Sequence, residues 1–258
     1  MPVSLLLRTL QELRRSMLTW GAVVGIFSAG LVGAYPLLRK AAQPFGALFS
    51  AGDLLDMSAP DAWLSAVGFD FVLPWLVCTF ALLAGSRLFV SQEAQSLFSL
   101  LLAYPQTRSK LLGERVAGLA LAILAMVAWG WVVLVVSTRL AGWDVSALNL
   151  AAACLSLVLL GLTFGGLGLA LSLWTSSLAL SRGIGLAFLL FSYLVYDFPH
   201  LLPNLSWLAA ISPFTYAFAS RPLQSGWSGG PVILAGATAL LVWLAWMEFN
   251  RRDVMVEK

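Results

Sequence analysis

The fold is decided by one long uncharged stretch, VSALNLAAACLSLVLLGLTFGGLGLALSLWTSSLALS, which runs from Val145 to Ser181. Its 37 residues include no Asp, Glu, Lys, Arg or His. A helix needs about 20 apolar residues to cross a bilayer, so the stretch is too long for one ordinary span and too short for two. Together with the run that follows, it predicts a span over 147–174, a turn beginning at Thr175, and another span over 180–196.

The composition of the whole chain extends this conclusion. Of the 258 residues, 60% are apolar and 10% are charged, against roughly 25% charged in a soluble protein. The chain is therefore expected to be an integral membrane protein. Its net charge of +3 is too small to indicate a nucleic-acid partner. Cys78 and Cys154 each lie inside an apolar run, and we expect both to be small core residues.

The remaining apolar runs complete a set of spans. The uncharged run from Ser16 to Leu38 has 23 residues, which is longer than the core of about 7–15 residues in a cleaved signal peptide. It is therefore expected to be a span, about 34 Å long at 1.5 Å per residue. We predict an all-α polytopic fold in a single domain over 1–258, with six spans at about 16–38, 67–90, 116–138, 147–174, 180–196 and 231–247.

The segments outside the spans also carry structural signals. Apolar residues at helical spacing near the N-terminus predict an amphipathic helix at the membrane interface before the first span. Residues 41–66 are expected to form an external loop with short surface helices. Residues 197–229 are rich in proline and aromatic residues and too broken to span, so short interfacial or re-entrant helices are expected there.

The distribution of Lys and Arg predicts the orientation in the membrane. With both termini inside, the inner loops and ends carry 11 of these cations and the outer ones carry 4. Membrane proteins concentrate Lys and Arg on the cytoplasmic side. We therefore expect cytoplasmic termini, and the segment 91–110 between the second and third spans is expected to be cytoplasmic as well.

The segment 91–110 is neither a short turn nor a soluble domain. Gln92, Gln95, Ser96 and Ser99 recur at the spacing of one helix face, with leucines over the rest. Tyr104-Pro105 is expected to end this helix, because the residue before a proline is disfavoured in the α region. The pattern predicts an amphipathic helix and a turn that lie along the cytoplasmic membrane surface.

Several function classes lack the residues they need. No ionisable residue lies near the centre of a predicted span, whereas ion-coupled transporters and proton relays depend on such residues. His200 is the sole histidine, lies in an external segment, and makes no recognisable catalytic or metal-binding pattern with the two cysteines. The sequence also has no G-x-x-x-x-G-K-[S/T] motif for a P-loop. Gly161 and Gly165 form a G-x-x-x-G, which suits close helix packing within the chain or against a second copy.

Three motifs stand out: the segment with Glu93, Pro105 and Arg108, the stretch Ile211 to Phe218, and the stretch Phe249 to Val254. They resemble motifs of ABC-2 type transporter permeases. In that family, an acidic residue, a Gly-Thr pair, a Leu-rich helix, a small residue, a Pro and a Ser-Arg pair occur between the second and third spans. Here Glu93, the run 100–103, Pro105 and Arg108 match, while Ser96-Leu97 replaces Gly-Thr and Thr107 replaces Ser. The supporting motifs are ISPFTYAF (Ile211 to Phe218) and FNRRDV (Phe249 to Val254).

This resemblance implies the membrane subunit of an ATP-binding-cassette exporter, with a coupling segment that docks on a separate ATPase. The subunit would be no enzyme and hold no cofactor or metal, since ATP and Mg²⁺ would bind to the partner ATPase. A second six-span permease, identical or paralogous, would complete the membrane part, in the plasma membrane of a bacterium or archaeon. The implied coupling residues are Glu93, Ala103, Tyr104, Pro105, Arg108 and Lys110.

The resemblance also implies that the second and fifth spans line a path for a hydrophobic or amphiphilic substrate at the interface between two subunits. The candidate aromatic wall of that path is Phe80, Phe188, Phe191 and Tyr193, and packing inside the bundle or against lipid is the alternative for these side chains. The alternative function is a non-transporting membrane scaffold that anchors a cytoplasmic partner. In either case Arg108 and Lys110 are available to contact anionic lipid headgroups.

Overall fold

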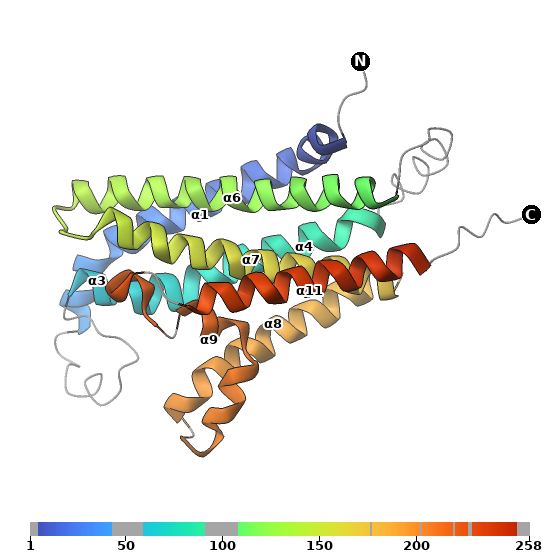
Figure 1. The fold of residues 1–258 in the computed structure, drawn as a ribbon. Helices are drawn as coiled ribbons and strands as arrows, with labels where there is room; N and C mark the ends of the chain where they lie inside the picture. Colours follow the sequence, from blue (N-terminus) through green and yellow to red (C-terminus); the bar gives the residue numbers. More distant parts are fainter. Residues whose placement is uncertain are drawn as a thin grey trace, which may run out of the picture.

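The structure of the chain is a computed structural model that describes residues 5–42, 59–90, 108–175, 177–201, 203–218, 220–226 and 229–251. Within these residues every regular element is a helix, and six helical stretches are long and apolar enough to cross a membrane. The predicted fold class is confirmed: the chain is an all-α polytopic membrane protein (Figure 1). The six-span core is formed by α1 (Leu5–Ala42), α3–η3–α4 (Pro60–Trp63, Leu64–Val72, Leu73–Val90), α6 (Arg108–Leu140), α7 (Ala147–Thr175), α8 (Leu178–Leu201) and α11 (Gly230–Arg251).

Helix α7 is the centre of the bundle. It packs against α4, α6, α8 and α11, and α4 and α11 flank it in Figure 1. In its most apolar window 67% of the residues are buried, against 28% in α8 and 17% in α11. This difference means that α7 is shielded by protein, whereas α8 and α11 present most of their apolar side chains to the surroundings.

Glycines allow α4 and α7 to pack at close range. A Cβ at Gly168 would lie 2.5 Å from the Leu82 carbonyl oxygen. Gly161 and Gly165 also face residues of the same chain, because Cβ atoms there would meet Val77 and Leu119. The G-x-x-x-G of α7 therefore packs within the chain. Both cysteines, Cys78 on α4 and Cys154 on α7, are buried, as expected.

The first two spans are longer than the sequence predicted. The predicted interfacial helix is the beginning of α1, which continues without a break through the first span. The second span begins at Pro60 rather than Val67, as α3 and then the π-helical η3. Proline is tolerated in the first turn of a helix, and Asp61 beside it complements the helix dipole. Pro60 and Asp61 therefore begin a helix where the sequence suggested a loop.

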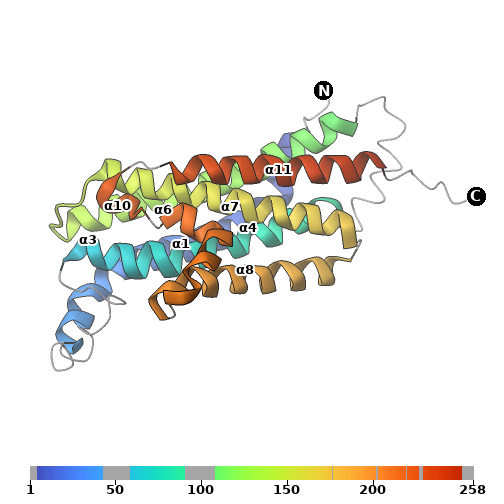
Figure 2. The same cartoon turned by 60° about the horizontal axis from the view of Figure 1, so that its bottom comes forward.

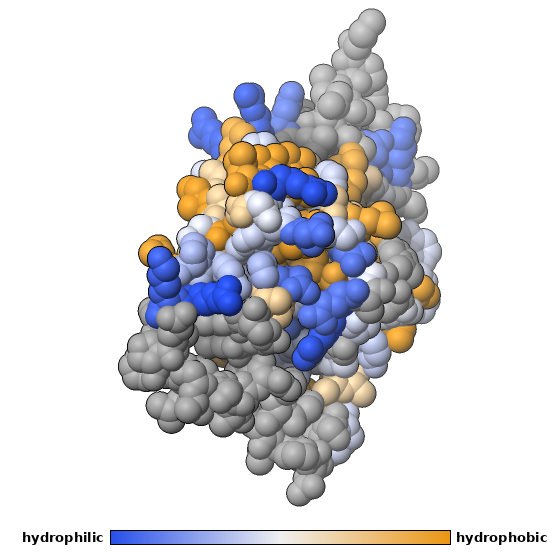
Figure 3. All heavy atoms as spheres, turned by 90° about the vertical axis from the view of Figure 1, so that its left-hand side faces the viewer, coloured by the Kyte–Doolittle hydropathy of each residue, from blue (hydrophilic) through white to orange (hydrophobic). Residues whose placement is uncertain are grey.

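Aromatic residues hold these spans together at the end of the bundle formed by α3 and the α6–α7 turn. The indole Nε1 of Trp63 donates a hydrogen bond to the Leu31 carbonyl oxygen at 2.9 Å. The Tyr35 ring lies between Trp63 and Trp143, with centroid distances of 6.1 Å and 5.1 Å. Hydrophilic side chains gather on this end face, as expected where spans leave a membrane (Figure 3).

The segment after the fifth span folds as short helices. Helix α8 continues beyond the predicted span to Leu201, and η4 (Pro203–Ile211), α9 (Pro213–Phe218) and α10 (Pro222–Ser225) follow it. Each of these three short helices begins with a proline, which fits the start of a helix but interrupts a continuing one. Short helices were predicted here and are found; their interfacial or re-entrant position on the outer side stays a prediction.

Helices α1 and α11 begin and end, respectively, at the opposite end of the bundle (Figure 1). We call this the terminal end. Helices α4 and α7 also finish there, and α6 and α8 begin there (Figure 1). The segment 91–107 therefore connects two helices whose ends lie at the terminal end, where α1 begins and α11 ends.

Candidate functional site

Two of the six predicted coupling residues, Arg108 and Lys110, belong to helix α6. Glu93, Ala103, Tyr104 and Pro105 lie outside the residues that the structure describes. Arg108 is the first residue of α6, so the last three residues of the predicted segment 91–110 belong to that helix. The Lys110 side chain is 60% exposed, and its Nζ lies 4.0 Å from the Glu114 carboxylate one turn later. An exposed pair of this kind contributes little to stability, so Lys110 is available to a partner.

A buried arginine joins the two helices on either side of the segment 91–107. Arg115 of α6 is only 5% exposed, and its guanidinium donates a hydrogen bond to the carbonyl oxygen of Leu88 near the end of α4. Hydrogen bonds from charged donors are stronger than neutral ones, and stronger still away from water. A displacement of the connecting segment would therefore act on α4 and α6 together.

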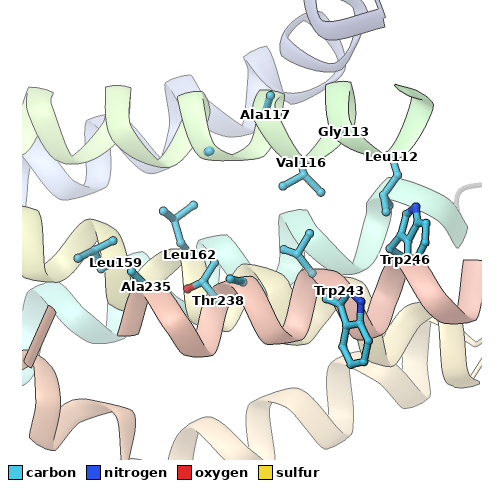
Figure 4. Close-up of a pocket in the computed structure, with 13 residues that line it drawn as sticks. Leu112, Gly113, Val116, Ala117, Leu159, Leu162, Ala235, Thr238, Trp243 and Trp246 are labelled. Atoms are coloured by element: carbon cyan, nitrogen blue, oxygen red, sulfur yellow. The ribbon is translucent and has the colours of Figure 1, made fainter. Parts of the chain in front are cut away.

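Helix α6 also forms one wall of an apolar groove of about 710 Å³. Figure 4 shows the groove between α6 and α11, with side chains of α7 on its floor. It extends from Leu112 and Trp246 at the terminal end toward Leu159 and Ala235 in the middle of the bundle (Figure 4). The volume is within the range of about 300–1,000 Å³ that small-molecule sites occupy.

The chemistry of the groove suits an apolar occupant. Among the residues that line it, Thr238 alone bears a hydroxyl group, and the Thr238 Oγ1 already shares a hydrogen bond with the Thr163 Oγ1 at 3.0 Å. The two other lining side chains with a polar atom, Trp243 and Trp246, lie toward the terminal end. Tryptophan is enriched where a span meets the membrane surface. An apolar tail would thus lie in the groove, and a polar head would lie near the tryptophans.

The four aromatic residues predicted to line a path lie in different surroundings in the described part of the chain. Phe80 is fully buried and its ring centroid lies 6.2 Å from that of Trp20. Phe188 packs 6.2 Å from Phe164, whereas Phe191 is 51% exposed. These positions favour packing for Phe80 and Phe188, and they leave Phe191 on the surface of α8.

Tyr193 belongs to an aromatic cluster in the half of α8 that is farther from the terminal end. Its ring centroid lies 5.4 Å from that of Trp75 and 5.6 Å from that of Phe214. Phe71 and Tyr196 complete the cluster. Phe191 and Tyr193 were predicted to line a path between two subunits. This stays a prediction, because it concerns an assembly of two chains.

The groove was not predicted, although its residues carry a sequence signal. Small residues occur at helical spacing on both walls, as Gly113, Ala117 and Ala120 on α6 and Ala235 and Ala239 on α11. Such a pattern is typical of helices in close contact. The pattern does not show that α6 and α11 are separated by a groove. The distance between α6 and α11 depends on α7, which packs against both of them.

A family model described as "Protein of unknown function (DUF2705)" matches residues 48–255. The chain belongs to this family. The DUF2705 match includes both walls of the groove, Arg115 with its partner Leu88, and the segment 91–107. A comparison with curated proteins found no match. Within the described residues, no group of three or more His, Cys, Asp and Glu side chains is placed to hold a metal ion.

Proposed function

We propose that this DUF2705 protein is the permease subunit of an ATP-binding-cassette transporter. The proposal takes its energy source from the resemblance of Glu93, Pro105 and Arg108 to the coupling motif of ABC-2 permeases. A separate ATPase would bind ATP and Mg²⁺, and a second six-span subunit would complete the membrane part. The cytoplasmic orientation of the termini, which the excess of Lys and Arg predicts, would place the coupling segment where such an ATPase can reach it.

The observation that carries the proposal is the link from the coupling segment to the groove. The segment connects α4 and α6, Arg115 bonds these helices to each other, and α6 forms a wall of the groove. Closure of the ATPase pair would push the segment and tilt α4 and α6 as a unit. This tilt would change the distance between α6 and α11, and with it the size of the groove.

The groove supports a hydrophobic or amphiphilic substrate. Its walls offer an apolar surface whose hydroxyl is already bonded, so a polar solute would lose hydrogen bonds to water without gaining others. An amphiphile would keep its polar head at the terminal end while its tail lay between α6 and α11. In the proposed orientation, the substrate would enter from the cytoplasmic half of the membrane and leave on the outer side.

The coupling segment can be tested by replacing Tyr104, Pro105 and Arg108 together with alanine in the full chain. We expect the variant to insert in the membrane and to fold, because the six spans do not depend on these residues, but to lose substrate transport driven by ATP hydrolysis. Arg251→Ala is the control, since it removes an exposed cation from the terminal end without altering the segment.

The measurement is ATP-dependent movement of an amphiphile in vesicles that contain the permease and its ATPase. The transport rate should fall at least tenfold in the triple variant, which corresponds to an activation free energy higher by about 1.4 kcal/mol. It should remain near normal in the control. Unchanged transport in the triple variant would refute the coupling assignment. A chain that binds its cytoplasmic partner yet never moves an amphiphile would instead be the scaffold of the alternative prediction.

A further inference from the structure

The terminal ends of α4 and α8 hold two arginines that no carboxylate neutralises within the described residues. Arg87 lies in the last turn of α4, and Arg182 lies in the first turns of α8. Helices α4 and α8 pack against each other (Figure 2). Arg87 directly follows Ser86, the residue of α4 that bonds to Arg182, so the packing of the two helices brings the two arginines near each other. Two like charges at this range repel each other, so the fold places an unbalanced positive charge at this position.

The Arg182 side chain is fixed in place but not satisfied. Its Nε donates a hydrogen bond to the Ser86 Oγ at 3.4 Å, and this serine is buried at the end of α4. Its Nη2 is buried without a hydrogen-bond partner in the described part of the chain. The Ser181 Oγ, in the same turn of α8, is also buried and unpartnered there. Buried polar groups normally have partners, which points to a ligand that accepts hydrogen bonds.

The ligand that fits this arrangement is a phosphate group. Guanidinium groups present parallel N–H donors that match the oxygens of a phosphate. A phosphate between Arg87 and Arg182 would balance both charges and accept a hydrogen bond from the Arg182 Nη2. The Ser181 hydroxyl beside it could donate a further bond.

The neighbouring surface of α8 indicates that the phosphate belongs to a lipid. Leu186, Leu190 and Leu194 are exposed and follow Arg182 at successive spacings of four residues, so they continue the side of the helix on which Arg182 lies. This apolar stripe begins beside Arg182 and extends along the span away from the terminal end. A phospholipid could place its headgroup on the arginines and its acyl chains along the stripe.

We propose that Arg87 and Arg182 form a binding site for the headgroup of an anionic phospholipid in the leaflet at the terminal end. In the orientation predicted from the Lys and Arg distribution, this is the cytoplasmic leaflet, in which anionic lipids attract basic groups of membrane proteins. The site is separate from the groove between α6 and α11. It therefore does not depend on whether the chain transports a substrate.

The test titrates the full-length chain in detergent with phosphatidylglycerol or with phosphatidylcholine that has the same acyl chains, and counts the bound lipids by native mass spectrometry. We expect phosphatidylglycerol to bind more tightly. Arg182→Gln and Arg87→Gln should each weaken its binding about tenfold, the usual effect of losing a hydrogen bond to a charged group. Arg251→Gln is the matched control and should change the binding by less than about twofold, because an exposed charge contributes little.

Two further arms keep the result decisive. Arg87 is exposed, so its replacement removes little packing and should leave the protein folded. Arg87→Gln therefore tests the site even if Arg182→Gln fails to fold. Inorganic phosphate is added to the unmodified chain at the same concentrations as the lipid. Equal effects of the two substitutions and of Arg251→Gln on lipid binding would overturn the proposal. Inorganic phosphate that displaces the lipid at equal concentration would also overturn it, because the site would then recognise free phosphate.

Discussion

At the scale of single residues, the contact between α4 and α7 depends on the absence of side chains. Gly168 lies against the Leu82 carbonyl oxygen, and Gly85 lies against the Gly165 carbonyl oxygen. Backbone atoms cannot move aside as the tip of a flexible side chain can. Any methyl group added at these positions must therefore separate the two helices.

We predict that Gly168→Ala destabilises the protein by about 1–3 kcal/mol, the usual cost of overpacking a buried site. The added methyl group has no room, because a Cβ at Gly168 would lie 2.5 Å from a backbone oxygen. Gly183→Ala is the control, since a Cβ there would meet no atom within 4 Å. The measurement is thermal unfolding in detergent. If both variants unfold at the same temperature, the close approach of α4 and α7 is wrong.

The sequence shows which residues are polar but not how each is used. In the sequence, Arg115 is one of the 11 cations that indicate the cytoplasmic side. In the fold it is buried and donates a hydrogen bond to the Leu88 carbonyl oxygen. Its partner is 27 residues away in the chain and carries no polar side chain. A backbone acceptor leaves no mark on the sequence, so this link could be found only in the structure.

At the scale of helices, α6 has two roles that depend on its position between the connecting segment and the groove. Its first residues follow the segment 91–107, and its small residues leave space opposite α11. The function of the groove can be tested by filling it from α6. Ala117 is suited to this purpose because it is exposed on the groove wall.

We predict that Ala117→Trp blocks binding of an apolar ligand in the groove. The larger side chain would occupy the space between α6 and α11 that the ligand needs, so we expect the affinity to fall at least tenfold, which corresponds to about 1.4 kcal/mol of binding free energy. Ala128→Trp is the matched control. Ala128 is three turns further along the same face of α6, is also exposed, and lies outside the groove.

The measurement is the affinity of an environment-sensitive apolar dye for the full chain in detergent. Dye binding should weaken in Ala117→Trp and remain unchanged in Ala128→Trp. Equal affinities for the two variants would show that the dye binds elsewhere, and the groove would then lose its proposed role.

The helices themselves were largely predictable, whereas their ends were not. Six uncharged runs indicated six spans, because a bilayer requires about 20 apolar residues for each crossing. The second span begins at Pro60 and not at Val67 as predicted, since proline and aspartate are common both in loops and at the first turn of a helix. The grouping of α6, α7 and α11 around the groove depends on contacts between distant residues, which periodicity does not encode.

At the scale of the whole molecule, an even number of spans places both chain ends on the same side. The structure has this arrangement, with the terminal end also carrying the connection between α4 and α6 (Figure 1). Which side of the membrane this is follows from the distribution of Lys and Arg alone. The orientation is therefore a separate prediction with its own test.

We predict that the terminal end faces the cytoplasm. Cys78 and Cys154 are buried, so single cysteines can be introduced elsewhere after both are replaced by alanine. Asp144→Cys in the α6–α7 turn should react with a membrane-impermeant thiol reagent on intact cells. Ser177→Cys, at the terminal end before α8, should react only after the cells are made permeable. The reverse labelling pattern would mean that the segment 91–107 cannot meet a cytoplasmic ATPase.

The central claim is that the segment between α4 and α6 docks on an ATPase. It is tested most directly with a photo-reactive amino acid in place of Tyr104. Cells that also contain the genes naturally adjacent to this one are irradiated, and the crosslinked protein is identified. Trp143, at the opposite end of the bundle, is the control position. We predict that a P-loop ATPase subunit is crosslinked from position 104 and not from position 143. If no ATPase is captured from position 104, or if it is captured equally from both positions, the account of this protein as a permease driven by ATP hydrolysis is contradicted.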